Sequence, residues 1–128
     1  DNAILQKIEA LGSDAVTFTG FISDEQLMEY LSTAELLVQP SLYEGFCLPP
    51  LEAMVLGTRA LISDIPVLRE IYDGYPVTFF RAIDHVDLKE KMLEILLKQN
   101  SSDFSLPEQL VEKYTFKKTA SIILRETK

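Results

Sequence analysis

Cysteine and histidine are almost absent from this chain, and their scarcity excludes several kinds of site. The 128 residues include one cysteine, Cys47, and one histidine, His85. A single cysteine cannot form an internal disulfide, which is typical of a protein from a reducing compartment. The two side chains lie far apart in the sequence and show no metal-ligand spacing, so we expect no metal site.

Long apolar runs and an excess of basic residues are also missing. Although 47% of the residues are hydrophobic, no run approaches the roughly 18 residues of a membrane-spanning helix. Lys and Arg number 12 against 20 Asp and Glu, which gives a net charge of -8. This charge argues against nucleic acid or an anionic membrane as a partner. The chain also has no internal repeat, no low-complexity block and no GxGxxG motif.

Segments with helical periodicity alternate with short apolar segments along the whole chain. Strands are predicted at residues 16–19, 35–39, 60–63 and 76–80. Helices are predicted at residues 2–11, 24–33, 50–56, 67–72 and 84–98, and, after a linker at 101–105, at 107–113 and 116–126. This alternation indicates one α/β domain over residues 1–128 with a parallel sheet flanked by helices, and with C-terminal helices within 106–128.

Residues 40–57 carry the two most informative side chains, the carboxylates of Glu44 and Glu52, eight positions apart. A predicted strand ends just before this segment, and Pro49 suits the first turn of a helix, where a missing N–H costs little. The segment therefore leads from the carboxyl end of a strand into a helix, which is where open α/β sheets bind ligands. Backbone N–H groups of residues 46–48 would face an anion there, assisted by the helix dipole.

Each of these residues also has a structural interpretation. Glu52 is typical of a capping box, although that needs an N–H that Pro49 as the cap residue would lack; it also suits the helix dipole. Glu44 taken alone is typical of a solvated loop. Cys47, near a helix start, is either a reactive thiol or a packed, unreactive one. His85 is typical of a surface residue.

Taken as a whole, the segment resembles the EX7E signature of retaining glycosyltransferases with the GT-B fold, and most closely family 4, the glycosyl transferases group 1. Members typically have Pro-Ser-x-x-Glu-Gly-Phe-Gly-Leu-Pro-x-Leu-Glu-Ala-Met-Ala-x-Gly. The chain matches this pattern at Pro40, Ser41, Glu44, Gly45, Phe46, Leu48, Pro49, Leu51, Glu52, Ala53, Met54 and Gly57. The resemblance implies that the predicted sheet is Rossmann-like and is part of the second domain of a GT-B fold.

The resemblance continues on both sides and covers nearly the whole chain. Residues 16–27 resemble the family's strand, glycine turn and helix start, residues 63–71 its Ser…Pro-Glu-Val segment, and residues 114–120 the start of its closing helix. Cys47 departs from the pattern, because the family usually has a second glycine there. If that position needs a positive φ, a residue other than glycine is strained. Thr58 stands where the family commonly has a proline.

The resemblance implies a site for a nucleotide sugar. Glu44 would be the catalytic residue, facing the hydroxyls of the donor sugar and orienting it or stabilising charge at the reacting carbon. Glu52 would accept hydrogen bonds from the ribose hydroxyls. The other expected substrate-binding residues are Gly45, Phe46, Cys47 and Leu48 at the sugar and diphosphate, and Gly20, Phe21 and Ile22 beside the nucleobase. The implied reaction transfers the sugar to an acceptor hydroxyl with retained configuration and needs no metal or other cofactor.

A GT-B enzyme has two domains with the reaction in the cleft between them, and this chain resembles only the later part of the second domain. We therefore expect a fragment of a retaining hexosyltransferase that is inactive by itself. Its expected partners are a UDP-, GDP- or ADP-linked sugar and a missing N-terminal acceptor domain. An uncovered sheet edge in such a fragment favours self-association. The expected location is cytoplasmic, with the missing domain as the part that would contact the inner face of a membrane.

Two other functions stay open. A nucleotide-sugar epimerase would use the same GT-B fold, although the fit of residues 44–57 to the signature disfavours it. A non-catalytic α/β module that binds a nucleotide or a protein partner would suit a chain with half of the cleft. The sequence identifies neither the sugar and base of the donor nor the acceptor.

Overall fold

Three parallel strands form the centre of the fold in the computed structural model, which describes residues 2–12 and 15–98. The strands are β1 (Leu36–Gln39), β2 (Arg59–Ser63) and β3 (Thr78–Phe80), and they lie in the order β1-β2-β3. In the register, Leu37 lies opposite Ala60, and Ile62 lies opposite Phe79. The parallel sheet with intervening helices confirms the predicted Rossmann-like α/β fold class.

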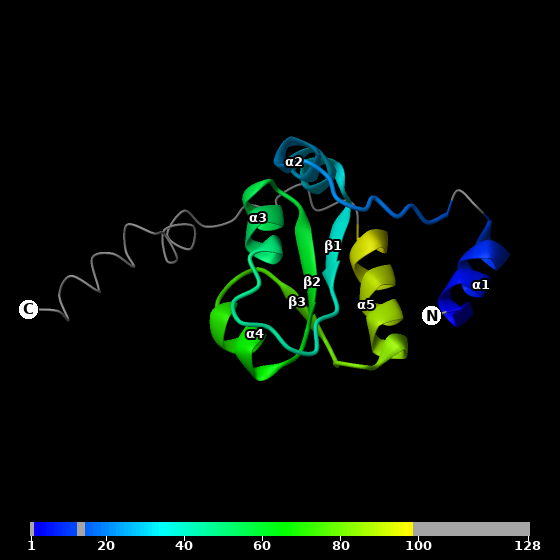
Figure 1. Cartoon of the computed structure of the whole chain (residues 1–128). Helices are drawn as coiled ribbons and strands as arrows, with labels where there is room; N and C mark the ends of the chain where they lie inside the picture. The colour runs from blue at the N-terminus through cyan, green and yellow to red at the C-terminus, as the bar shows by residue number, and fades with distance from the viewer. Residues whose placement is uncertain (1, 13–14, 99–128) are drawn as a thin grey trace, which may run out of the picture.

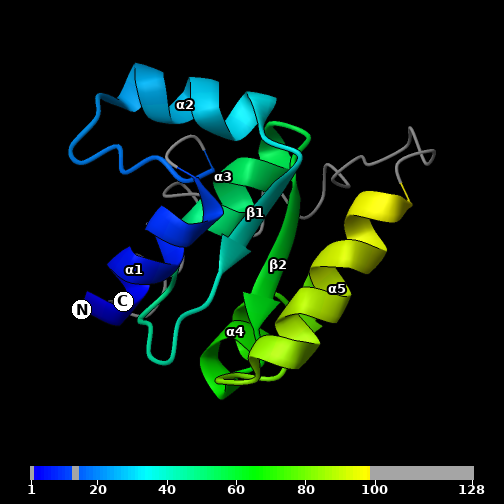
Figure 2. The same ribbon diagram turned by 90° about the vertical axis from the view of Figure 1, so that its right-hand side faces the viewer.

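Helices cover both faces of this sheet (Figure 1). Helices α3 (Pro49–Val55) and α4 (Pro66–Ile71) lie on one face, and α5 (His85–Leu97) lies on the other. Helix α2 (Asp24–Thr33) packs against α3 near the start of β1, and α1 (Asn2–Leu11) stands apart from the sheet in that view. Figure 2, viewed from the side that carries α5, shows this helix running along the length of the sheet.

Most of the predicted elements are confirmed, with bounds that differ by one or two residues, as is usual at element ends. Ser23 caps α2 in a capping box with Gln26, and Asp84 caps α5 by accepting hydrogen bonds from two backbone N–H groups. Helix α3 begins at Pro49 and not at Pro50, and its cap residue is Leu48. The linker and helices predicted within residues 101–128, and with them the proposed C-terminal part, lie outside the described residues.

The strand predicted at residues 16–19 is wrong. This segment is extended but carries no strand, and Val16 and Phe18 are 37% and 71% exposed. An apolar, β-branched segment becomes a strand only when a neighbouring strand accepts its hydrogen bonds. In the sheet of described strands, β1 pairs with β2 alone, and residues 16–19 are not hydrogen-bonded as a further strand.

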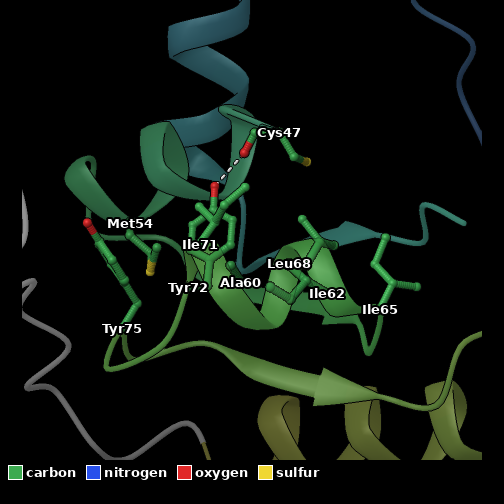
Figure 3. Close-up of a cluster of buried hydrophobic side chains, with 9 residues drawn as sticks. All are labelled: Cys47, Met54, Ala60, Ile62, Ile65, Leu68, Ile71, Tyr72 and Tyr75. Carbon is green, nitrogen blue, oxygen red and sulfur yellow. Dashed lines mark hydrogen bonds between the residues drawn. The ribbon is translucent and has the colours of Figure 1, made fainter. Parts of the chain in front are cut away.

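The main core lies between the sheet and helices α3 and α4 (Figure 3). Its buried members come from the turn before α3, from both helices, from β2 and from the loops that follow β2 and α4: Cys47, Met54, Ala60, Ile62, Ile65, Leu68, Ile71, Tyr72 and Tyr75. Leu61 alternates with Ala60 and Ile62 along β2, so it points to the opposite face and is also fully buried. The turn that carries the predicted site is thus part of the core packing.

Thr58 joins the end of α2 to the start of β2 from a buried position. Its side-chain hydroxyl donates a hydrogen bond to the carbonyl of Leu31, 27 residues earlier. We expect Thr58→Val to lower the free energy of unfolding by about 1–2 kcal/mol, because the isosteric change leaves a buried carbonyl without its donor. Urea denaturation of this variant beside Thr33→Val measures the effect, since the exposed Thr33 hydroxyl bonds only within its own helix. Equal losses in the two variants would contradict this role for Thr58.

Candidate functional site

The Glu44 carboxylate lies just beyond the carboxyl end of β1, half-buried in the loop that leads to α3. Its Oε1 atom accepts a hydrogen bond from the Ser41 hydroxyl at 2.6 Å and from the Gln39 side-chain amide at 3.3 Å. The Gln39 amide also donates to the Ser41 hydroxyl at 2.8 Å. Glu44 is therefore not a freely solvated loop carboxylate, because neighbouring donors fix one of its oxygens.

Ser63, at the carboxyl end of β2, supports this network from the neighbouring strand. Its buried hydroxyl faces two backbone carbonyls, those of Gln39 at 3.2 Å and of Ser41. Ser63 therefore holds in place the same two residues that hold Glu44. Neither Gln39 nor Ser63 was among the predicted site residues. A polar residue at the end of each buried strand was the available signal.

Cys47 completes the surroundings of Glu44. Its backbone has a φ of 62°, in the left-handed region where residues other than glycine are rare. The condition left open by the sequence is therefore met, because the position adopts a positive φ, and the resulting strain is on the order of 1–2 kcal/mol. Burial, the negative charge of Glu44 and a hydrogen bond to that carboxylate raise the pKa of the Cys47 thiol to about 12. The thiol is therefore packed, protonated and unreactive, and it donates to Glu44.

Glu52 lies in the first turn of α3 and is half-buried. Because Leu48 is the cap residue and makes no side-chain capping bond, Glu52 is one position too far along for a capping box. Its backbone N–H donates to the Leu48 carbonyl at 3.1 Å, as an ordinary helical residue would. The capping interpretation of Glu52 is therefore excluded, and the binding and helix-dipole interpretations remain.

The residues between the two glutamates form one continuous turn. Gly45 and Leu48 are exposed, and Phe46 is half-buried against the core. Within the described part of the chain, the N–H groups of Cys47 and Leu48 donate to no backbone carbonyl. These two N–H groups thus lie outside the backbone–backbone hydrogen bonds of the described residues, and their contact with an anion stays a prediction.

The predicted nucleobase turn lies at a different place, before α2. Gly20 has a φ of 61°, Phe21 is fully exposed, and Ile22 is half-buried. None of the described hydrogen bonds connects these three residues to the loop that carries Glu44. Their contact with a nucleobase stays a prediction.

An apolar cavity of about 280 Å³ lies at the carboxyl edge of the sheet. It is lined by Pro40, Leu42, Phe80, Ile83, Asp84, His85 and Leu88. Neither of the two site glutamates lines it, and His85 is exposed as predicted. Within residues 2–12 and 15–98, no group of three His, Cys, Asp or Glu side chains is arranged to hold a metal ion. No described helix is long and apolar enough to cross a membrane.

Comparison with known proteins identifies the family. The family described as "Glycosyl transferases group 1" matches residues 1–114. The serotype-specific mannosyltransferase WbdA of Escherichia coli is 39% identical over 95 residues, which are 73% of this chain and 12% of WbdA. The mannosylfructose-phosphate synthase of Agrobacterium fabrum is 32% identical over 95 residues, 73% of this chain and 21% of that protein.

A third relative is similar over a shorter segment. The O-antigen chain mannosyltransferase RfbU of Salmonella typhimurium is 47% identical over 58 residues, 45% of this chain and 16% of RfbU. The matched segments thus make up 12% to 21% of these three relatives. Together, the family match over residues 1–114 and the parallel α/β sheet show that the chain belongs to the group 1 glycosyl transferases and contains part of a GT-B fold.

Proposed function

We propose that this chain is the donor-binding portion of a retaining glycosyltransferase, which moves a sugar from a nucleotide sugar to an acceptor hydroxyl. The observation that carries the proposal is the Glu44 carboxylate, held at the carboxyl end of β1 by hydroxyl, amide and thiol donors. The names of the relatives, two mannosyltransferases and a mannosylfructose-phosphate synthase, favour mannose as the transferred sugar. They also favour a transferase over an epimerase.

In this proposal, Glu44 acts as a fixed acceptor and a fixed negative charge. Its Oε1 atom is occupied by Ser41 and Gln39, while a carboxylate has about four acceptor positions in all. The remaining positions can accept hydrogen bonds from the hydroxyls of a sugar. A charge held by neighbouring donors also needs little reorganisation when positive charge develops at the reacting carbon. We do not assign Glu44 a covalent role.

Glu52 and the turn would bind the nucleotide part of the donor. Carboxylates accept hydrogen bonds from ribose hydroxyls in other nucleotide-binding α/β folds, and no capping bond engages Glu52. The N–H groups of Cys47 and Leu48 are suitable donors for the diphosphate oxygens. These local donors would have to offset the net charge of -8. We propose further that the reaction needs no metal, and that the acceptor site belongs to a domain outside these residues.

The first experiment is calorimetric titration of the purified chain with UDP, GDP and ADP. We expect one of the three to bind, and Glu52→Ala to raise its Kd about tenfold, because a charge-assisted hydrogen bond to ribose is lost. Glu70→Ala is the matched control, because it removes the same charge from an exposed position on α4. The affinity of this control should equal that of the unchanged chain.

The same titration also distinguishes donor binding from the alternative functions. If the nucleotide binds the Glu52→Ala variant as tightly as it binds the unchanged chain, the assignment of Glu52 to nucleotide binding is contradicted. If a catalytically active protein containing this chain bound none of the three nucleotides, the donor-site proposal would be wrong and a protein-interaction module would be favoured. Retention is tested in that active protein by the anomeric configuration of its product, which NMR resolves directly. An inverted product would overturn that part of the proposal.

A further inference from the structure

Tyr72 contacts the turn between the two glutamates from outside the sequence motif. It follows the last residue of α4, it is 1% exposed, and it lies 20 positions after Glu52. Its hydroxyl donates a hydrogen bond to the backbone carbonyl of Cys47 (Figure 3). This bond joins a buried side chain to the one left-handed residue of the turn.

The Tyr72 side chain is also packed with helix α3. It lies in the same buried core cluster as Met54 of α3, and the charge of Glu52 acts on its hydroxyl. Burial raises the pKa of Tyr72, so its hydroxyl stays a donor throughout the physiological pH range. One side chain thus connects the turn that carries Cys47 with the helix that carries Glu52.

The two ends of Cys47 are held from opposite directions. Its carbonyl points toward the Tyr72 hydroxyl, while its thiol points away from that tyrosine (Figure 3) and donates to Glu44. A non-glycine residue with a φ of 62° persists only where its surroundings hold it. The Tyr72 hydroxyl is the side-chain group that holds the backbone at this point. Movement of the carbonyl would therefore also move the thiol away from Glu44.

We infer that Tyr72 is a positioning residue of the donor site, because its hydroxyl fixes the left-handed turn at Cys47 and with it the relative placement of Glu44 and Glu52. The assignment of these two glutamates to a donor rests on the proposed function. The structural part of the inference, that Tyr72 holds the turn, does not depend on it. The two parts can be tested separately.

The thiol of Cys47, the only cysteine of the chain, can be used to measure how often the turn opens. Cys47 is 8% exposed, so a thiol reagent labels it only when the turn or the whole fold opens. Labelling rates measured at increasing urea concentrations separate local opening from global unfolding. We expect Tyr72→Phe to label about tenfold faster than Tyr75→Phe in the absence of urea, because the bond that closes the turn is lost.

Tyr75→Phe is a matched control. Tyr75 belongs to the same core, and its ring packs edge-on against Tyr72 with centroids 5.5 Å apart. Its hydroxyl points away from the Cys47 carbonyl in Figure 3. Both variants remove one tyrosine hydroxyl from one core, so general destabilisation affects both. Equal labelling rates in the two variants would overturn the inference.

The second arm uses a catalytically active protein that contains this chain. We expect Tyr72→Phe to lower kcat and donor kcat/KM about tenfold relative to Tyr75→Phe at temperatures where both are folded, since misplacement of site groups slows catalysis. Faster labelling with donor kinetics equal to those of the control would overturn the positioning role. Glu44→Ala and Glu52→Ala are measured in parallel. Unchanged activity in both would refute the proposed function and leave the labelling result to decide whether Tyr72 holds the turn.

A measurement on the unchanged chain covers the case in which Tyr72→Phe does not fold. NMR follows exchange of the Tyr72 hydroxyl proton with water. A proton that exchanges much more slowly than that of free tyrosine supports a persistent bond to the Cys47 carbonyl. Exchange as fast as that of free tyrosine would show that the bond does not hold the turn, and would overturn the inference.

Discussion

Glu44→Ala is expected to lower kcat by about 10²–10³-fold in a catalytically active protein that contains this chain, with less than about a threefold change in nucleotide Kd. The size follows from losses measured when one preorganised group that stabilises transition-state charge is removed. The carboxylate is fixed by Ser41, Gln39 and the Cys47 thiol, so its removal deletes a charge that is already in place. Steady-state kinetics and nucleotide titration measure the two effects.

Glu44→Gln is the informative companion variant. It keeps the size of the side chain and one acceptor oxygen but removes the negative charge. If charge is what the reaction needs, this variant should be nearly as slow as Glu44→Ala. Glu70→Ala serves again as the exposed-glutamate control. A loss in nucleotide affinity as large as the loss in kcat would instead assign Glu44 to ground-state binding and contradict the catalytic role.

Leu61→Ala is expected to lower the free energy of unfolding by about 3 kcal/mol, the middle of the range for leucines truncated in protein cores. Leu61 is completely buried in β2, the central strand, and β1 and β3 pair with β2 on either side. A cavity there cannot close by the movement of an edge strand. Since a domain of this size has a total stability of roughly 5–15 kcal/mol, this change removes a large part of it.

Leu97→Ala is the matched control for that measurement. Leu97 is 82% exposed at the end of α5, so its truncation removes little buried surface. Urea denaturation should show a large drop in midpoint for Leu61→Ala and almost none for Leu97→Ala, with equal slopes. A loss below about 1 kcal/mol at Leu61 would indicate that β2 is not the packed centre of the fold.

The turn between Glu44 and Glu52 is packed as part of the main core. Cys47 contributes its side chain to the main core and its thiol to Glu44, and Tyr72 contributes its ring to the same core and its hydroxyl to Cys47. Packing on the face covered by α3 and α4 therefore sets the geometry of the site. This coupling explains how a strained, non-glycine residue is kept in the turn.

Local patterns predicted most of the fold because they depend on neighbours in the chain. Apolar periodicity located α2, β1, β2 and α5, and the two prolines located the start of α3 to within one residue. Residues 16–19 had the local pattern of a strand, but they pair with none of the described strands. An extended segment becomes a strand only when it is hydrogen-bonded to a neighbouring strand. The sequence could not supply that information, because strand pairing is a long-range property.

The sequence by itself determined the family and the alternation of helices and strands, and it singled out the two glutamates, since all of these are encoded in contiguous residues or short spacings. Only the tertiary structure decided that Cys47 has a positive φ and which groups surround these residues. Ser63 meets Ser41 across 22 positions, and Tyr72 meets Cys47 across 25. The first forms because parallel strands bring their carboxyl ends to one edge of the sheet, and the second because α4 packs on the same face of the sheet as the turn before α3. No pattern of neighbouring residues in the sequence predicts these two hydrogen bonds.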